Sequence, residues 1–233
     1  MMKEQAIEYL QLLNPNKDIT RMFKKGVRIG IYGSSFDPIT NVHLWTASTV
    51  AHRKKLDYII FLPSIGKARR DKTLQTQDKH REEMVKMAIA NNPKFILDTY
   101  EMTVLPEKQY TYYTMEYFRN VFKDAEVFFI MGADLLVDIA NGKWRMDEEL
   151  ITCNQFIVMA RNGIDMLEAI SHSPLLRNND DGRFQLLDKG LAMEISSTYI
   201  RQEFARGGEP QYLLPESCYQ YIKENNLYEK IVR

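Results

Sequence analysis

The chain has 233 residues, of which 31 are lysine or arginine and 31 are aspartate or glutamate, so its formal net charge is zero. A zero balance argues against a protein that coats nucleic acid or binds membranes through a polybasic surface, but it leaves room for a local basic site. The apolar content of 45% is ordinary for a globular protein, and the length allows a hydrophobic core without disulfides. We therefore expect a globular protein of one or two domains.

Cysteine usage and apolar runs indicate the cellular setting. Cys153 and Cys218 are the only cysteines, too few for a disulfide scaffold or a zinc framework. Cys153 adjoins the apolar run 155–159, which predicts a buried free thiol. No apolar stretch reaches the roughly 18 residues of a membrane helix, and no secretory signal is apparent. These features predict a cytoplasmic protein that binds neither membrane nor nucleic acid.

Short apolar runs alternate with helical patterns along most of the chain. Residues 1–26 are helical in pattern and form an N-terminal appendage. Buried strands are predicted at 27–32, 58–62, 95–97, 127–131 and 155–159. Helices are predicted at 42–54, 78–91, 114–122 and 147–152. This alternation predicts an α/β fold with a Rossmann-like, doubly wound parallel sheet.

The C-terminal part has a different character. Hydroxyl residues 196–198 precede a helix over 199–206, and Gly207 and Gly208 end it. A last helix is predicted at 215–225. We therefore divide the main domain, 27–233, into a sheet core that extends to about 190 and a small helical C-terminal part over 191–233.

The segment from Gly30 to His43 carries the most chemical information. A strand ends at Gly33 and a helix begins near Asn41, and in an open α/β sheet such a junction binds ligands. Backbone N–H groups and the positive end of the helix favour an anion there. The small residues Ser34 and Ser35 would let a phosphate approach the backbone. A plain glycine turn followed by a helix-surface histidine is the alternative.

Two further segments could serve an anion or a sugar. Ser196, Ser197 and Thr198 start a helix in which Arg201 lies one turn on, and its planar fork suits a phosphate. The alternative is an ordinary serine cap with a surface arginine. Asp134 follows the strand 127–131 and could accept hydrogen bonds from ribose hydroxyls, or it could simply cap a helix.

These segments occur in the order of a known family. Residues 30–38, Gly-Ile-Tyr-Gly-Ser-Ser-Phe-Asp-Pro, resemble the GIFGGTFDP signature of the nicotinamide/nicotinate mononucleotide adenylyltransferases. Residues 40–43 resemble their [H/T]-x-G-H motif, and 195–201 match their I-S-S-T-x-x-R motif. The resemblance continues at 80–90, at 132–134, at 143–150 and at 214–228, so it covers about residues 27–228.

The resemblance implies adenylyl transfer from ATP to nicotinate or nicotinamide mononucleotide, which gives the dinucleotide and pyrophosphate in NAD biosynthesis. It implies that Mg²⁺ enters on the ATP phosphates, with no metal site of the protein's own. His43 and Arg201 would be catalytic. The residues implied in ATP binding are Gly33, Ser34, Ser35, Phe36, Thr40, His43, Gly132, Asp134, Ser196, Ser197, Thr198 and Arg201. Those implied in mononucleotide binding are Ser34, Ser35, Lys67, Arg70, Thr111, Thr114 and Trp144.

Some of these assignments have structural alternatives. Trp144 could be a core tryptophan instead of stacking on the pyridine ring, and the basic run 66–72 could be a solvated loop. Val42 replaces the usual glycine, and Tyr113 replaces the aspartate of the bacterial T-x-D-T segment. The preference between acid and amide substrates therefore remains open. The sequence is compatible with a homo-oligomer but does not give the oligomeric state. The alternative functions are another nucleotidyltransferase of the same superfamily and a nucleotide-binding regulator without turnover.

Overall fold

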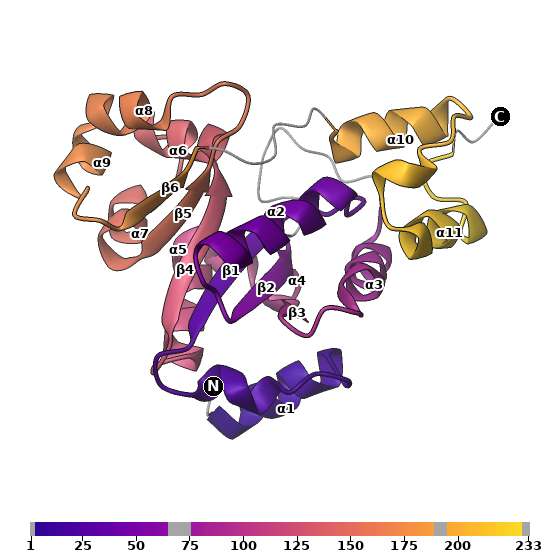
Figure 1. The fold of residues 1–233 in the computed structure, drawn as a ribbon, viewed down its shortest axis with the longest axis horizontal. Coiled ribbons are helices and arrows are strands. Elements are labelled where there is room, and N and C mark those ends of the chain that lie inside the picture. Colours follow the sequence, from indigo (N-terminus) through magenta and orange to yellow (C-terminus); the bar gives the residue numbers. More distant parts are fainter. Residues whose placement is uncertain (1–2, 65–75, 189–194, 230–233) are drawn as a thin grey trace.

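The computed structural model describes residues 3–64, 76–188 and 195–229 (Figure 1). The strands are β1 (Arg28–Ser34), β2 (Tyr58–Pro63), β3 (Phe95–Leu97), β4 (Glu126–Gly132), β5 (Gln155–Met159) and β6 (Phe184–Leu187). The longer helices are α1 (Lys3–Leu13), α2 (Asn41–Arg53), α3 (Asp78–Ile89), α5 (Thr111–Val121), α6 (Ala133–Ala140), α7 (Asp147–Cys153), α8 (Met166–His172), α10 (Ser197–Ala205) and α11 (Glu216–Glu224). Short helical turns are η1 (Ile19–Phe23), α4 (Tyr100–Thr103), η2 (Pro106–Lys108), α9 (Pro174–Asn178) and η3 (Gln211–Leu213).

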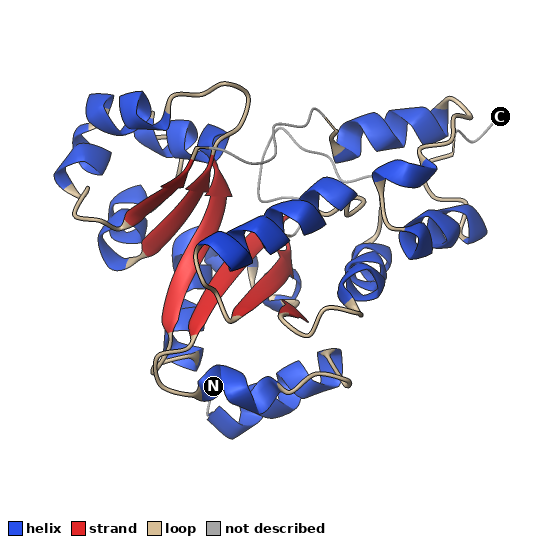
Figure 2. Cartoon of the chain, in the orientation of Figure 1, coloured by secondary structure: helices blue, strands red, loops and turns tan. Residues whose placement is uncertain are grey.

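The six strands form one parallel sheet in the order β3-β2-β1-β4-β5-β6 (Figure 2). The chain starts in the middle of the sheet, moves outward to β3, and returns to place β4 on the other side of β1. In open sheets of this kind, ligands bind beyond the carboxyl ends of the strands where the order reverses. Here that position lies between β1 and β4.

Helices cover both faces of the sheet because alternate strand residues point to opposite sides. In β2, Ile60 and Leu62 belong to the core cluster that includes α1, α5 and α6 to α9. Ile59 and Phe61 belong to the cluster that includes α2, α3, α10 and α11. This arrangement confirms the predicted doubly wound parallel sheet. Among the described residues, no helix is both long enough and apolar enough to cross a membrane.

The N-terminal segment packs more closely than an appendage implies. Ala6 and Leu10 of α1 are buried in the same cluster as the sheet. The side-chain amide of Asn14 donates to the carbonyl of Leu97 at 2.9 Å and accepts from the N–H of Leu97 at 2.9 Å. The hydroxyl of Tyr9 lies 2.8 Å from that of Thr99. The segment is therefore bonded to the end of β3 as well as packed on the sheet.

The structure adds elements that the sequence pattern does not reveal. β6 lies at the edge of the sheet, and only Phe184 among its residues is fully buried, so its apolar run is too short to be recognised. Helix α6 begins directly at the end of β4, without an intervening loop. The prediction of a buried thiol at Cys153 is wrong, because that residue is exposed at the end of α7 while Leu150 and Ile151 face the core.

Candidate active site

The loop over residues 34–40, which we call the 34–40 loop, connects β1 to α2 at the reversal point of the sheet. Three of its carbonyl oxygens accept hydrogen bonds from side chains elsewhere in the chain: Ser35 O from Arg81 Nη1 at 2.6 Å, Asp37 O from Arg201 Nη1 at 2.6 Å, and Pro38 O from Ser197 Oγ at 2.8 Å. These donors come from α3 and α10, so the loop is held from two elements besides its own strand and helix.

Fixing the carbonyls of Ser35 and Pro38 also fixes the N–H groups of Phe36 and Ile39, which belong to the same peptide units. The carbonyl of Asp37 is followed by Pro38, which has no N–H. The C=O and N–H of a trans peptide unit point in opposite directions. With Ser35 O directed at Arg81, the N–H of Phe36 is directed away from it. Phe36 itself has a φ of 45°, in the left-handed region that few non-glycine residues adopt. Its side chain is fully buried, so only its main chain can meet a phosphate, as implied for this position.

His43 is held in a defined orientation by Thr40. Thr40 caps α2, and its backbone N–H lies 3.0 Å from His43 Nδ1, with its hydroxyl 2.8 Å from the same nitrogen. A backbone N–H can only donate, so Nδ1 accepts and the neutral ring carries its hydrogen on Nε2. Nε2 is then the nitrogen that can donate to a phosphate oxygen. The edge of the Phe36 ring packs on the imidazole, with centroids 5.1 Å apart.

Helix α10 brings the second motif to the first. Ser196 caps the helix, accepting from the N–H of Tyr199 at 3.2 Å. Arg201 donates to Thr198 Oγ1 at 3.2 Å as well as to the 34–40 loop, and its Nε has no partner among the described residues. The predicted hydroxyl and arginine residues therefore meet the predicted loop, although they lie some 160 residues apart in the chain.

The carboxylate of Asp134 follows β4, which neighbours β1 on the side opposite to β2. Asp134 lies in the first turn of α6, and Arg161 Nη1 is 3.8 Å from its Oδ2. Asp134 Oδ1 has no partner among the described residues, and the side chain as a whole is 35% exposed, so the carboxylate can turn an unused acceptor to a ligand hydroxyl. A Cβ at Gly132 would lie 2.4 Å from this Oδ1, so only glycine allows the carboxylate this position.

Comparisons with known proteins agree with this geometry. A cytidylyltransferase-like family model matches residues 31–203. The chain is 35% identical over 198 residues to the probable nicotinate-nucleotide adenylyltransferase of Clostridium tetani, an alignment that covers 85% of this chain and 97% of that protein. It is 33% identical over 203 residues to the nicotinate-nucleotide adenylyltransferase of Bacillus subtilis, covering 87% and 98%. The chain belongs to the nicotinate-nucleotide adenylyltransferase family.

A solved structure supports the same assignment. The nicotinic acid mononucleotide adenylyltransferase of Plasmodium falciparum, complexed with NaAD, superposes with a TM-score of 0.69 at 25% identity, covering 87% of this chain and 97% of that chain. Family membership confirms the resemblance drawn from the motifs, and with it adenylyl transfer in NAD biosynthesis as the enzyme class.

Arg81 is a residue of the candidate site that the sequence pattern did not predict. Its side chain is fully buried, and Nη1 donates to Ser64 O at 2.7 Å as well as to Ser35 O. Nη2 pairs with Asp78 Oδ1 at 2.6 Å. One guanidinium thus ties together the chain just beyond the ends of β1 and β2. The only signal was its place in the 80–90 segment that resembles the family.

The residues expected at the pyridine side of this family's site have a mixed placement. Thr111 begins α5 and is half-buried, whereas Thr114 is buried and donates to Glu101 Oε1 at 2.8 Å. Trp144 is half-buried against the core, with its ring 6.3 Å from that of Phe129. Lys67 and Arg70 lie outside the described residues.

The buried carboxyl group of Asp98 stabilises the start of α4, the helix that contains Glu101, the hydrogen-bond partner of Thr114. Asp98 is 1% exposed, and its Oδ1 accepts from the N–H of Tyr100 at 2.7 Å. Burial raises the pKa of Asp98 from 3.8 to about 7, and burial likewise raises the pKa of Glu101 to about 7. The folded enzyme therefore binds a proton at Asp98 more strongly than the unfolded chain does.

Asp98 should make the stability of the enzyme depend on pH. Because the folded pKa is the higher one, the stabilisation is complete below about pH 4 and is lost as the pH rises through about 7. The variant Asp98→Asn keeps the acceptor for Tyr100 but cannot ionise. We expect the wild type to lose free energy of unfolding relative to this variant between about pH 4 and pH 7, measured by urea titration. Parallel pH curves for the two proteins would contradict this assignment.

Proposed function

We propose that this chain transfers the adenylyl group of ATP to nicotinate mononucleotide. A phosphate oxygen of the mononucleotide forms a bond to the α-phosphorus of ATP, the bond from that phosphorus to the bridging oxygen breaks, and pyrophosphate leaves. The mononucleotide phosphate has a second pKa near ~6, so it is largely dianionic at neutral pH and needs no strong base. Positioning and charge stabilisation then supply most of the catalysis.

The observation that carries this proposal is the anchoring of the 34–40 loop. Side chains from α3 and α10 hold three of its carbonyls, and two of these, Ser35 O and Pro38 O, share a peptide unit with an N–H. This favours N–H groups of Phe36 and Ile39 that are directed to a phosphate. In this arrangement Ser34, Ser35 and the main chain of Phe36 would line the phosphates, with Arg201 and the hydroxyls of 196–198 opposite. His43 would donate from Nε2 to the charge that develops on the phosphates.

Sugar and pyridine contacts complete the proposed site. Asp134 offers a part-exposed carboxylate, one oxygen of which has no partner among the described residues, to a ribose hydroxyl, and Gly132 makes room for that carboxylate. Trp144 would face the pyridine ring. Thr111 would lie beside the pyridine substituent at the start of α5, and among the described residues no side chain caps this helix. A helix N-terminus favours a carboxylate over a neutral amide, which supports nicotinate over nicotinamide.

Magnesium would enter with ATP. The only carboxylate in the 34–40 loop, Asp37, is fully buried and accepts from Tyr228, whereas Ser34 and Ser35 offer hydroxyl oxygens. This donor set fits a metal held mainly by phosphate oxygens and water, with serine oxygens nearby. Bound there, Mg²⁺ neutralises phosphate charge. We propose the cytoplasm as the place of this reaction.

The test is release of pyrophosphate by the purified protein. ATP and Mg²⁺ are supplied with nicotinate mononucleotide, with nicotinamide mononucleotide, or with neither, and initial rates give kcat/KM for each. We expect turnover only with a mononucleotide and a higher kcat/KM for the acid. Pyrophosphate from phosphopantetheine but not from either mononucleotide would favour another member of the superfamily. ATP binding without pyrophosphate from any acceptor would favour a regulator.

A further inference from the structure

Tyr228 reaches the 34–40 loop from the C-terminal end of the described chain. It lies beyond α11, and its ring is 6.2 Å from the ring of Phe204 in α10. Its hydroxyl donates to Asp37 Oδ1 at 2.6 Å, across 191 residues of sequence. The backbone of Tyr228 has a φ of 65°, in the left-handed region. A tyrosine held in that conformation, with its hydroxyl in a part-buried hydrogen bond to the 34–40 loop, indicates a specific use.

The acceptor of this hydrogen bond, Asp37, carries a negative charge close to the proposed phosphate site. Its side chain is fully buried, and it belongs to the loop whose N–H groups are proposed to face phosphates. A carboxylate repels a triphosphate, and the repulsion is strongest where water is excluded. A buried carboxylate also needs donors, since leaving it unpaired is costly. A donor on the protein side therefore keeps the negative charge turned away from the anion.

The surroundings of the Tyr228 hydroxyl suit that task. Burial raises its pKa, and the charge of Asp37 raises it further, so the phenol stays a neutral donor. The side chain of Thr76 is hydrogen-bonded to the same phenol. The main-chain carbonyl of Asp37 is held separately by Arg201. Tyr228 thus holds the side chain of Asp37, and Arg201 holds its main-chain carbonyl.

We propose that Tyr228 is a positioning residue for ATP: its hydroxyl holds the Asp37 carboxylate inside the protein, so that the 34–40 loop presents donors and not a negative charge to the phosphates. This inference rests on the proposed binding of ATP at that loop. It assigns a role to the C-terminal segment, which touches no reacting group.

Tyr228→Phe tests the hydroxyl alone, because the ring and its packing on Phe204 remain. We expect the dissociation constant of ATP with Mg²⁺, measured by calorimetry, to rise about ten-fold, the factor that corresponds to one lost hydrogen bond to a charged group. The KM for the mononucleotide should change less than two-fold. Tyr219→Phe is the matched control, since Tyr219 stacks on the same Phe204 at 5.9 Å and its hydroxyl bonds to no residue of the 34–40 loop.

A double-mutant cycle with Asp37→Asn separates charge placement from packing. An asparagine carries no charge to repel ATP, so adding Tyr228→Phe to Asp37→Asn should leave ATP affinity at the Asp37→Asn value. The same ten-fold loss in both backgrounds, or equal affinities for Tyr228→Phe and Tyr219→Phe, would overturn the inference. A wild-type protein that binds no ATP would instead overturn the proposed function. Thermal melting of each variant checks that it is folded at the assay temperature.

Discussion

Replacing His43 with alanine should lower kcat by about a hundred-fold or more, the scale on which one preorganised donor to developing charge acts. Thr40 already holds the imidazole ring in its orientation before the reaction, so no free energy is needed to reorient the ring during catalysis. The KM for ATP should rise much less than kcat falls, because the interaction strengthens as charge develops on the phosphates. Steady-state pyrophosphate release with saturating nicotinate mononucleotide measures both parameters.

His52→Ala is the control for this prediction. His52 lies on the same helix, α2, but is exposed near its other end, so its loss should leave kcat unchanged. Loss of the His43 side chain also removes part of the α2 cap, which costs about 1 kcal/mol of stability. Circular dichroism at the assay temperature separates that cost from the loss of turnover. A wild-type kcat in the folded His43→Ala protein would refute the proposed role.

Replacing Arg81 with methionine should lower the free energy of unfolding by about 2 to 6 kcal/mol. The guanidinium donates to the carbonyls of Ser35 and Ser64, and each carbonyl left without a donor in the interior costs about 1 to 3 kcal/mol. Methionine matches much of the length of arginine and limits the cavity. Urea unfolding monitored by fluorescence gives the difference.

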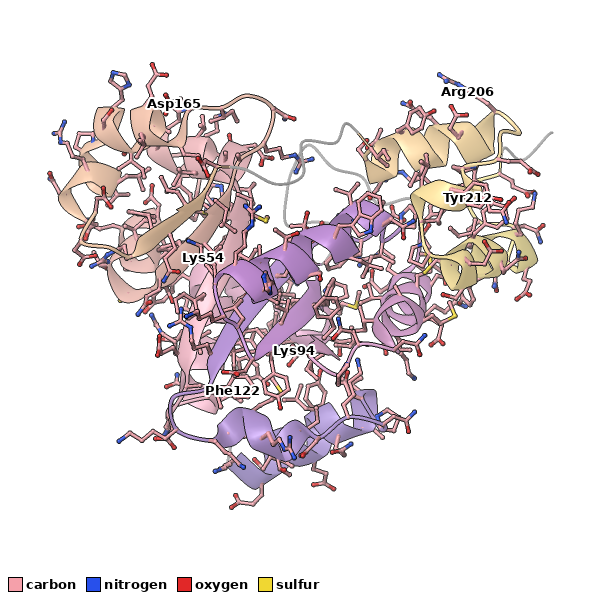
Figure 3. The ribbon with its side chains drawn as sticks, viewed as in Figure 1. Lys54, Lys94, Phe122, Asp165, Arg206 and Tyr212 are labelled. Atoms are coloured by element: carbon pink, nitrogen blue, oxygen red, sulfur yellow. The ribbon has the colours of Figure 1, made fainter. Side chains whose placement is uncertain are left out.

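Arg206→Met provides the comparison for a surface arginine. Its side chain is 68% exposed, on the α10 side of the C-terminal part (Figure 3), and lies 3.7 Å from Glu203, so its removal should cost less than about 1 kcal/mol. Arg81→Met should also weaken ATP binding, since the Ser35 peptide loses its anchor. Equal destabilisation by the two substitutions would show that Arg81 is not the clamp that the geometry indicates.

Local patterns predicted the fold and the candidate site where a short stretch of sequence decides the structure. The strand predicted to end at Gly33, which ends at Ser34, and the serine cap at Ser196 are signals of this kind, since each depends on residues within a few positions. The order of the motifs along the chain indicated the family. The parallel sheet then brought the ends of β1 and β4 together, as its topology requires.

Contacts between segments that are distant in the chain are not marked by any local sequence pattern. A charged residue in a helix is normally solvated, so nothing local marks Arg81 as fully buried between carbonyls 46 and 17 residues away. Tyr228 appeared only as part of a closing segment similar to the family's. Phe36 was placed beside phosphates by its motif, but the structure buries its ring and leaves only its main chain for that role.

The side chain of Asn14 has a consequence for how copies of this protein can associate. β3 is an outer strand of the sheet, and outer strands template the addition of a strand from another molecule through their unpaired N–H and C=O groups. The side-chain amide of Asn14 hydrogen-bonds both the N–H and the C=O of Leu97, the same two groups that an added strand would use. A second chain could extend the sheet at Leu97 only by displacing this amide, so self-association through that margin is disfavoured.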